Sequence, residues 1–203
     1  IQFVLPPAAE SRKIVCSIRR RQMKNLSLAD YESAGAFLDV KANHRSGKSN
    51  EKLAELYRER DYLNFIQAAI KARKNILICG GTGTGKTTFL NACLKCIPES
   101  ERLITVEDTR EVVVDHPNTA HLIFNENEAA INSLNIFKAC LRLRPDRIFL
   151  SELRGAEVWP YLRAANSGHP GSLSTVHADT PEGAFTQLVM MMQQAGSTST
   201  EEQ

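Results

Sequence analysis

Apolar and polar positions along this chain follow two different patterns. Between residues 51 and 71 apolar side chains recur at roughly helical spacing, which predicts one or two helices. From residue 75 onward, short apolar runs alternate with longer amphipathic stretches. We expect strands at 76–79, 103–106, 121–124, 147–151 and 172–176, and helices near 86–96, 130–143, 155–166 and 181–194. Near-continuous apolar strands that alternate with helices predict an α/β fold, with a mostly parallel central sheet covered on both faces.

The first fifty residues have a different character. Residues 1–25 combine two short apolar runs, which we expect to be strands, with a basic cluster at 19–21. Residues 26–50 are mixed and end in a polar stretch that is typical of a linker. Because two strands do not make a stable domain alone, we expect their partner strands upstream and interpret the chain as a piece of a longer protein.

Composition narrows the class of protein. The 203 residues include 25 Lys and Arg against 23 Asp and Glu, a formal net charge of +2, and 42% are hydrophobic. These values are typical of a globular domain and exclude wholesale disorder, which needs low hydrophobicity and high net charge. They also argue against a nucleic-acid binder held by a bulk electrostatic field. No run of about 18 apolar residues is present, so no membrane-spanning helix is expected.

The five cysteines are scattered and odd in number, which does not indicate a disulfide framework. Reduced thiols in a cytosol fit them better. Cys93 and Cys96 are the one CxxC pair, and without a second pair they cannot form a four-thiolate zinc site. We interpret them as two small apolar residues one turn apart on an expected helix.

A phosphate-binding motif follows the first apolar run of the α/β region. Residues 80–87 read GGTGTGKT and match G-x-x-x-x-G-K-[ST] in full, before an expected helix. Glycines let backbone N–H groups approach phosphate without Cβ clashes, and the helix N-terminus adds partial positive charge. Lys86 is expected to reach the β- and γ-phosphates of ATP, and the Thr87 hydroxyl to bind Mg²⁺. The predicted nucleotide-binding residues are Gly81, Thr82, Gly83, Thr84, Gly85, Lys86, Thr87 and Thr88.

Carboxylates follow two further apolar runs. Glu152 ends the run at 147–151, and Glu107 and Asp108 end the run at 103–106. The carboxyl ends of parallel strands meet at the ligand crevice of such a sheet, so we expect these side chains near the phosphate loop. Glu152 is a candidate for the metal's water shell or for polarising the attacking water. Glu107 is a candidate for orienting that water, and Asp108 for the Mg²⁺ shell.

His177 ends another apolar run and is therefore expected at the same edge, where it could hydrogen-bond the γ-phosphate. A lone histidine at a strand end is usually structural, but polar strand ends beside a phosphate loop favour a functional role. His44, His116 and His121 lie in linker-like or loop contexts, and we interpret them as ordinary polar residues.

Five arginines cluster around the Glu152 run, at positions 142, 144, 147, 154 and 163. In ring-shaped ATPases such residues neutralise transition-state charge, in some cases from the next subunit. We select Arg142 and Arg144 as candidate arginine fingers. Most of the others are interpreted as salt-bridge or surface groups.

Four segments now coincide in order: GGTGTGKTT, ITVEDTRE, RPDRIFLSELRG and GHPGSLSTVHAD. Together they resemble the Walker A loop, Asp box, Walker B segment and His box of the VirB11-type traffic ATPases, within the wider secretion and pilus ATPase superfamily. The resemblance runs from about Leu5 to about Met192. The early stretch CSIRRRQMKNLSLADYESAGAF is similar to the end of the N-terminal domain in the VirB11 branch. Ser151 departs from the glycine that the family usually has there, and its small size predicts little effect.

The resemblance implies a RecA-like P-loop ATPase domain at 51–203, truncated at its C-terminus. It implies that 1–25 is the remnant of a small α/β N-terminal domain and that 26–50 is a linker. The matching positions imply catalytic roles for Lys86, Glu107, Glu152 and His177, and metal roles for Thr87, Asp108 and Glu152.

Family members are hexameric rings, so the resemblance also implies a homo-hexamer that works with other secretion-system ATPases and inner-membrane components. It implies a cytoplasmic protein, peripheral at the inner membrane of a bacterium, with no obligate nucleic-acid partner. Hydrolysis of ATP with Mg²⁺ would then power substrate translocation or pilus assembly by a type IV secretion system.

Three other interpretations stay open at this point. One is a motor of the same superfamily that serves type IV pili or type II secretion. Another is a RecA-type nucleic-acid motor, which the low aromatic content and balanced charge disfavour and the basic cluster at 19–21 favours. The third is a chain that binds nucleotide without hydrolysing it.

Overall fold

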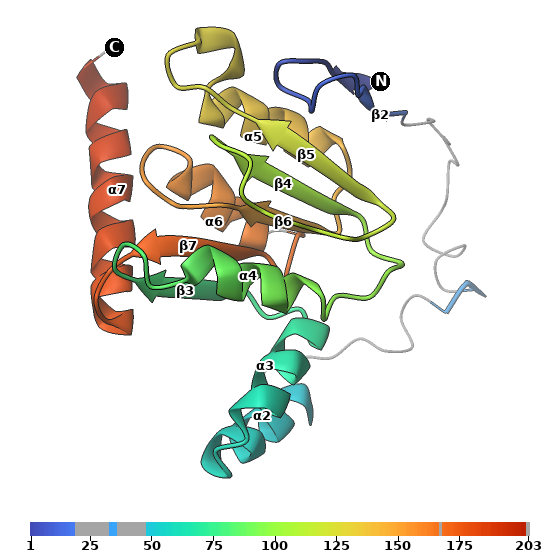
Figure 1. Ribbon diagram of the computed structural model, residues 1–203, viewed down its shortest axis with the longest axis vertical. Helices are drawn as coiled ribbons and strands as arrows, with labels where there is room; N and C mark the ends of the chain where they lie inside the picture. The colour runs from blue at the N-terminus through green and yellow to red at the C-terminus, as the bar shows by residue number, and fades with distance from the viewer. Residues whose placement is uncertain (19–32, 36–47, 167, 202–203) are drawn as a thin grey trace.

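The centre of the molecule is a five-stranded parallel sheet (Figure 1). The computed structural model describes residues 1–18, 33–35, 48–166 and 168–201. Neighbouring strands are all parallel and stand in the order β3-β7-β6-β4-β5. Their bounds are β3 (Ile76–Gly80), β4 (Leu103–Glu107), β5 (Thr119–Ile123), β6 (Arg147–Leu150) and β7 (Leu173–His177). All five expected strands are confirmed.

Helices cover both faces of this sheet (Figure 1). One apolar cluster packs α5, α6 and α7 against one face, and another packs α3 and α4 against the other. Leu103 and Ile104 are neighbours in β4, are both fully buried and belong to different clusters. Two-sided burial explains why the strands read as continuous apolar runs. The helices are α2 (Lys48–Arg58), α3 (Tyr62–Lys71), α4 (Lys86–Leu94), α5 (Ser133–Arg142), α6 (Val158–Asn166) and α7 (Pro181–Glu201), with a 3-10 turn η1 (Ala129–Ile131).

The first residues pack beside the outer strand β5. Strands β1 (Gln2–Val4) and β2 (Val15–Ser17) pair antiparallel, and the intervening Ala8 accepts a hydrogen bond from the Ile123 N–H at 2.7 Å. Val4, Ala8 and Ala9 are buried in the same apolar cluster as α5 and α6. The basic cluster at 19–21, His44 and most of the expected linker at 26–50 lie outside the described residues.

The amino edge of the sheet, where the strands begin, is closed by a buried ion pair. Arg147 is fully buried, and its Nε and Nη2 donate to both carboxylate oxygens of Glu101 at 2.7 and 2.9 Å. Its Nη1 donates to the Ile70 carbonyl at 2.8 Å, which ties α3 to the start of β6. Arg147 lowers the pKa of the Glu101 carboxyl, chiefly through these hydrogen bonds. A Cβ at Gly171 would lie 2.8 Å from Arg147 Nη1, so the turn before β7 needs glycine.

The carboxyl edge is built differently. The phosphate-loop segment and the polar strand ends all emerge there, because every strand of the sheet runs in the same direction. Among the helices of the described residues, none combines the length and the apolar character needed to cross a membrane.

Candidate active site

The phosphate-loop segment joins β3 to α4, and its backbone requires glycine. Gly83 and Gly85 have φ angles of 75° and 87°, in the left-handed region that side chains with a Cβ rarely adopt. A Cβ at Gly80 would lie 2.6 Å from Thr84 Oγ1. The two positive φ angles and the close approach at Gly80 therefore explain why glycine stands at these positions of the motif.

Lys86 folds back over this loop. Its Nζ donates to the carbonyl oxygens of Gly80 and Gly81 at 3.0 and 2.9 Å. Helix α4 begins at Lys86, and no side chain caps its N-terminus at Gly85. The first turn therefore presents backbone amides and a positive helix end to the loop. Thr87 Oγ1 lies 3.5 Å from Glu111 Oε2, at the limit of hydrogen bonding, and Thr88 is exposed.

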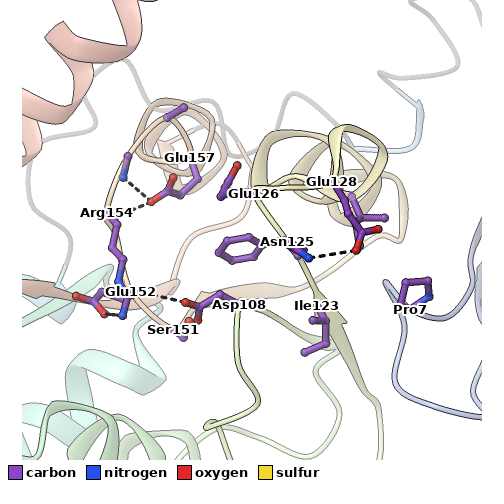
Figure 2. A pocket seen from close by; sticks show the side chains of 14 residues that line it. Pro7, Asp108, Ile123, Asn125, Glu126, Glu128, Ser151, Glu152, Arg154 and Glu157 are labelled. Atoms are coloured by element: carbon purple, nitrogen blue, oxygen red, sulfur yellow. Dashed lines mark hydrogen bonds and ion pairs between the residues drawn. The ribbon is translucent and has the colours of Figure 1, made fainter.

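Side chains from three strand ends form one line, which we call the strand-end network: His177, Glu152, Arg154 and Asp108. His177 Nε2 lies 2.8 Å from Glu152 Oε1, and the other Glu152 oxygen pairs with Arg154 Nη2 at 2.5 Å. Arg154 Nη1 donates to Asp108 Oδ2 at 2.9 Å, as Figure 2 shows. Glu152 and Asp108 both hold Arg154 in its charged form, and Glu152 raises its pKa most. The structure thus brings together three of the predicted site residues with Arg154, which the sequence analysis grouped with the salt-bridge or surface arginines.

The strand-end network begins beside the phosphate loop. Gly80, the first residue of the motif, is the register partner of His177 in the β3–β7 pair. A cavity of about 540 Å³ is lined by Gly81, Thr82, His177 and Asp179 among others. A second cavity, of about 610 Å³, is lined by Glu152, Arg154 and Asp108 and is seen in Figure 2. The network therefore links the cavity at the phosphate loop to a second hollow farther along the carboxyl edge.

Glu157 holds the turn that carries Arg154, and sequence reasoning missed it. Its carboxylate is buried, and Oε1 accepts the backbone N–H groups of Arg154 and Gly155 at 2.6 and 2.8 Å (Figure 2). A carboxylate two residues after a turn glycine was the available signal. Asp179 was also missed, although it follows His177 by two residues and lines the cavity at the phosphate loop.

Glu107 lies under a loop instead of facing a cavity. Its side chain is fully buried, and Oε1 accepts the N–H groups of Glu111 and Val112 at 3.0 and 2.7 Å. Oε2 accepts the Thr105 hydroxyl at 2.9 Å. Val112 is buried against α4, so the chain after β4 folds back over Glu107. In this arrangement Glu107 organises the loop, and the strand-end network does not include it.

The two candidate arginine fingers lie away from this site within the chain. Arg142 ends α5, and Arg144 follows it just before β6 begins, so both stand near the amino edge of the sheet and are exposed. A role in a neighbouring copy stays a prediction. The sequence did not show which carboxylates Arg147 and Arg154 would contact.

The three predicted Mg²⁺ ligands carry oxygen atoms of the kind that this ion prefers. Among the described residues no group of three or more His, Cys, Asp and Glu side chains is arranged to hold a metal ion by itself. Mg²⁺ needs no such cage, because it is usually bound by one or two carboxylates, water and substrate phosphates. The Thr87 hydroxyl and the Asp108 and Glu152 carboxylates have the hard oxygen atoms that it prefers.

Known proteins resemble this chain over nearly its whole length. The type IV secretion system protein VirB11 of Bartonella quintana is 39% identical over 210 residues, which cover 96% of this chain and 59% of that protein. VirB11 of Brucella suis is 37% identical over 201 residues, covering 96% of this chain and 56% of that protein. The crystal structure of the Brucella suis VirB11 ATPase in complex with sulphate is 36% identical, with a TM-score of 0.87 over 95% of this chain and 58% of that one.

This chain therefore spans a little over half the length of those relatives. The likeness confirms the predicted resemblance to the VirB11 type and the predicted RecA-like α/β fold. The sequence model of the type II/IV secretion system proteins matches residues 42–201. The chain belongs to the family of type II/IV secretion system proteins.

Proposed function

We propose that this chain is the nucleotide-hydrolysing part of a motor ATPase that powers a bacterial type IV secretion system. The observation that carries the proposal is the register of β3 with β7, which sets the phosphate loop beside His177 and, through it, Glu152. The resemblance to VirB11 favours a type IV secretion motor over the related motors of type IV pili and type II secretion.

In the proposed binding step, the loop amides and the N-terminus of α4 take the phosphates of ATP. Lys86 exchanges its two loop carbonyls for phosphate oxygens, which are stronger partners because they are charged. Thr87, Asp108 and Glu152 would hold Mg²⁺ and its water shell. When bound, Mg²⁺ would supply positive charge beside the phosphates and offset the negative charge that develops on them in the transition state.

In the proposed hydrolysis step, Glu152 orients the attacking water. His177 contacts Glu152 and lies beside the phosphate loop, so it would connect the two. Glu152 is held on both oxygens, by His177 and by Arg154, so its position is fixed before substrate binds. Fixed groups stabilise the transition state without reorganising at the moment of reaction. Glu107 would contribute by holding the loop that begins at Asp108.

The wider assembly belongs to the same proposal. We infer a homo-hexamer at the cytoplasmic face of the inner membrane, in which Arg142 or Arg144 of one copy serves the site of the next. Other secretion-system ATPases and inner-membrane components would be its partners. Residues 1–25 and 26–50 would be the end of an N-terminal domain and the linker that joins it to the motor domain.

Lys86→Ala tests the function. In the full-length protein we expect ATP turnover to fall on the order of 10³-fold, because a positioned charge at the transferring phosphate is lost. Lys95→Ala is the matched control, since Lys95 is exposed at the other end of α4 and its loss should leave turnover unchanged. Turnover by Lys86→Ala equal to that of the control would contradict the proposal.

A further inference from the structure

His121 is a buried histidine that the proposed mechanism does not use. It lies on β5 with 8% of its surface exposed, and its register partner on β4 is Thr105. The two side chains meet, with His121 Nδ1 2.7 Å from Thr105 Oγ1. Thr105 and Glu107 stand two residues apart on the same face of β4, and Thr105 Oγ1 lies 2.9 Å from Glu107 Oε2. A line of hydrogen bonds therefore runs from His121 through Thr105 to Glu107.

Chemistry fixes the direction of this line. The Thr105 hydroxyl has a single proton, and it donates that proton to Glu107 Oε2. The Thr105 oxygen is then left to accept the hydrogen that His121 carries on Nδ1. Burial, and secondly Arg110, lower the pKa of His121 to about 4, which keeps the ring neutral near pH 7. The order is thus His121 Nδ1–H to Thr105 Oγ1–H to Glu107 Oε2.

The far end of the line reaches the helix that carries Lys86. Glu107 Oε1 accepts the N–H groups of Glu111 and Val112, and the next residue, Val113, donates its N–H to Asn91 Oδ1 on α4 at 3.1 Å. The same loop begins with Asp108, a member of the strand-end network. Rotation of the Glu107 carboxylate would release two amides of this loop at once.

We propose that Thr105 and His121 are positioning residues that set the Glu107 carboxylate and, through it, the loop at 108–113 beside the phosphate site. This inference rests on the proposed ATPase function. Neither residue touches a predicted substrate position, so each acts only through Glu107. The Thr105 hydroxyl contacts both His121 and Glu107. Removing this one hydroxyl therefore interrupts the line with the least change in side-chain shape.

Thr105→Val removes the hydroxyl and keeps the size and β-branching of the side chain. In the full-length protein we expect kcat for ATP to fall about tenfold or more, the effect of one lost hydrogen bond to a charged group, while the nucleotide Kd changes less than about twofold. Thr105→Ser restores the hydroxyl and should return kcat to within about twofold of the unmodified protein. Ser172→Ala is the matched control, because it removes a buried hydroxyl at the opposite edge of the sheet.

Amide hydrogen exchange gives a second readout that does not depend on catalysis. Protection of the Glu111 and Val112 amides should fall in Thr105→Val and in His121→Leu, and should be retained in His121→Asn, which keeps an N–H donor near Nδ1. Unchanged kcat in Thr105→Val, or a loss that Ser172→Ala shares, would overturn the positioning role. Should the unmodified full-length protein hydrolyse no ATP, the proposed function fails, and the exchange pattern still decides the inference.

Discussion

The two edges of the sheet each carry an arginine–glutamate pair, in opposite environments. At the amino edge Arg147 is fully buried, and three of its nitrogens are used by Glu101 and the Ile70 carbonyl. At the carboxyl edge the Arg154 side chain is 62% exposed and is shared between Glu152 and Asp108. The same residue types therefore lock the fold at one edge and stay accessible to solvent at the other.

Removing Arg147 should have the largest effect on stability. Arg147→Ala leaves the Glu101 carboxylate buried, and among the described residues its remaining ion-pair partner is the partly exposed Arg73, at 3.0 Å. Breaking a buried pair from one side costs about 3–5 kcal/mol of the free energy of unfolding. Denaturant-induced unfolding measures this loss. A loss below about 1 kcal/mol would mean that the amino edge behaves like an exposed surface pair, and the contrast between the edges would fall.

The sequence predicts the carboxyl edge well where the constraints are local. The phosphate loop depends on glycines within eight residues, and the apolar runs identify each strand without knowledge of its neighbours. For the same reason His177 and Glu152 were placed at one edge, and their contact at 2.8 Å agrees with that expectation.

Long-range contacts account for what the sequence did not reveal. The burial of Glu107 depends on a loop that folds back from Val112 to α4, and the partner of His121 depends on the register of β4 with β5. His121 was therefore interpreted as an ordinary polar residue, and Glu107 was expected to face the nucleotide. Arg147 likewise gives no local sign that its partner is Glu101, 46 positions away.

The hydrogen-bonded line of His121, Thr105 and Glu107 sharpens the comparison between the two edges, because it ends at the carboxyl edge and is nevertheless buried. His121 has a pKa of about 4 in the folded chain against 6.5 as its ordinary value, with burial as the main cause. The charged groups that act on it are Arg110 and Lys13, which lower the pKa further, and Glu10, which raises it. Between pH 6.5 and 4 the unfolded chain binds a proton on His121 that the folded chain does not, so acid favours unfolding.

This difference predicts a loss of up to about 3 kcal/mol in the free energy of unfolding as the pH falls from 7 to 4. His121→Asn cannot titrate, so its stability should fall by correspondingly less over the same range. Denaturant unfolding of both proteins at several pH values gives the difference between the two curves. Parallel curves would show that His121 titrates normally and is not buried as described.

The smallest effect on stability is expected from Arg154, at the exposed edge. Arg154→Ala should change the free energy of unfolding by less than about 1 kcal/mol, because exposed ion pairs gain little over their hydration. Salt screens exposed charges more than buried ones, so even this difference should shrink at high ionic strength, whereas the loss in Arg147→Ala should persist. Unfolding of both variants in low and high salt tests the two edges under one measurement. Equal salt dependence at both would mean that solvent reaches both pairs alike, and burial would then not be what separates the structural arginine from the one at the site.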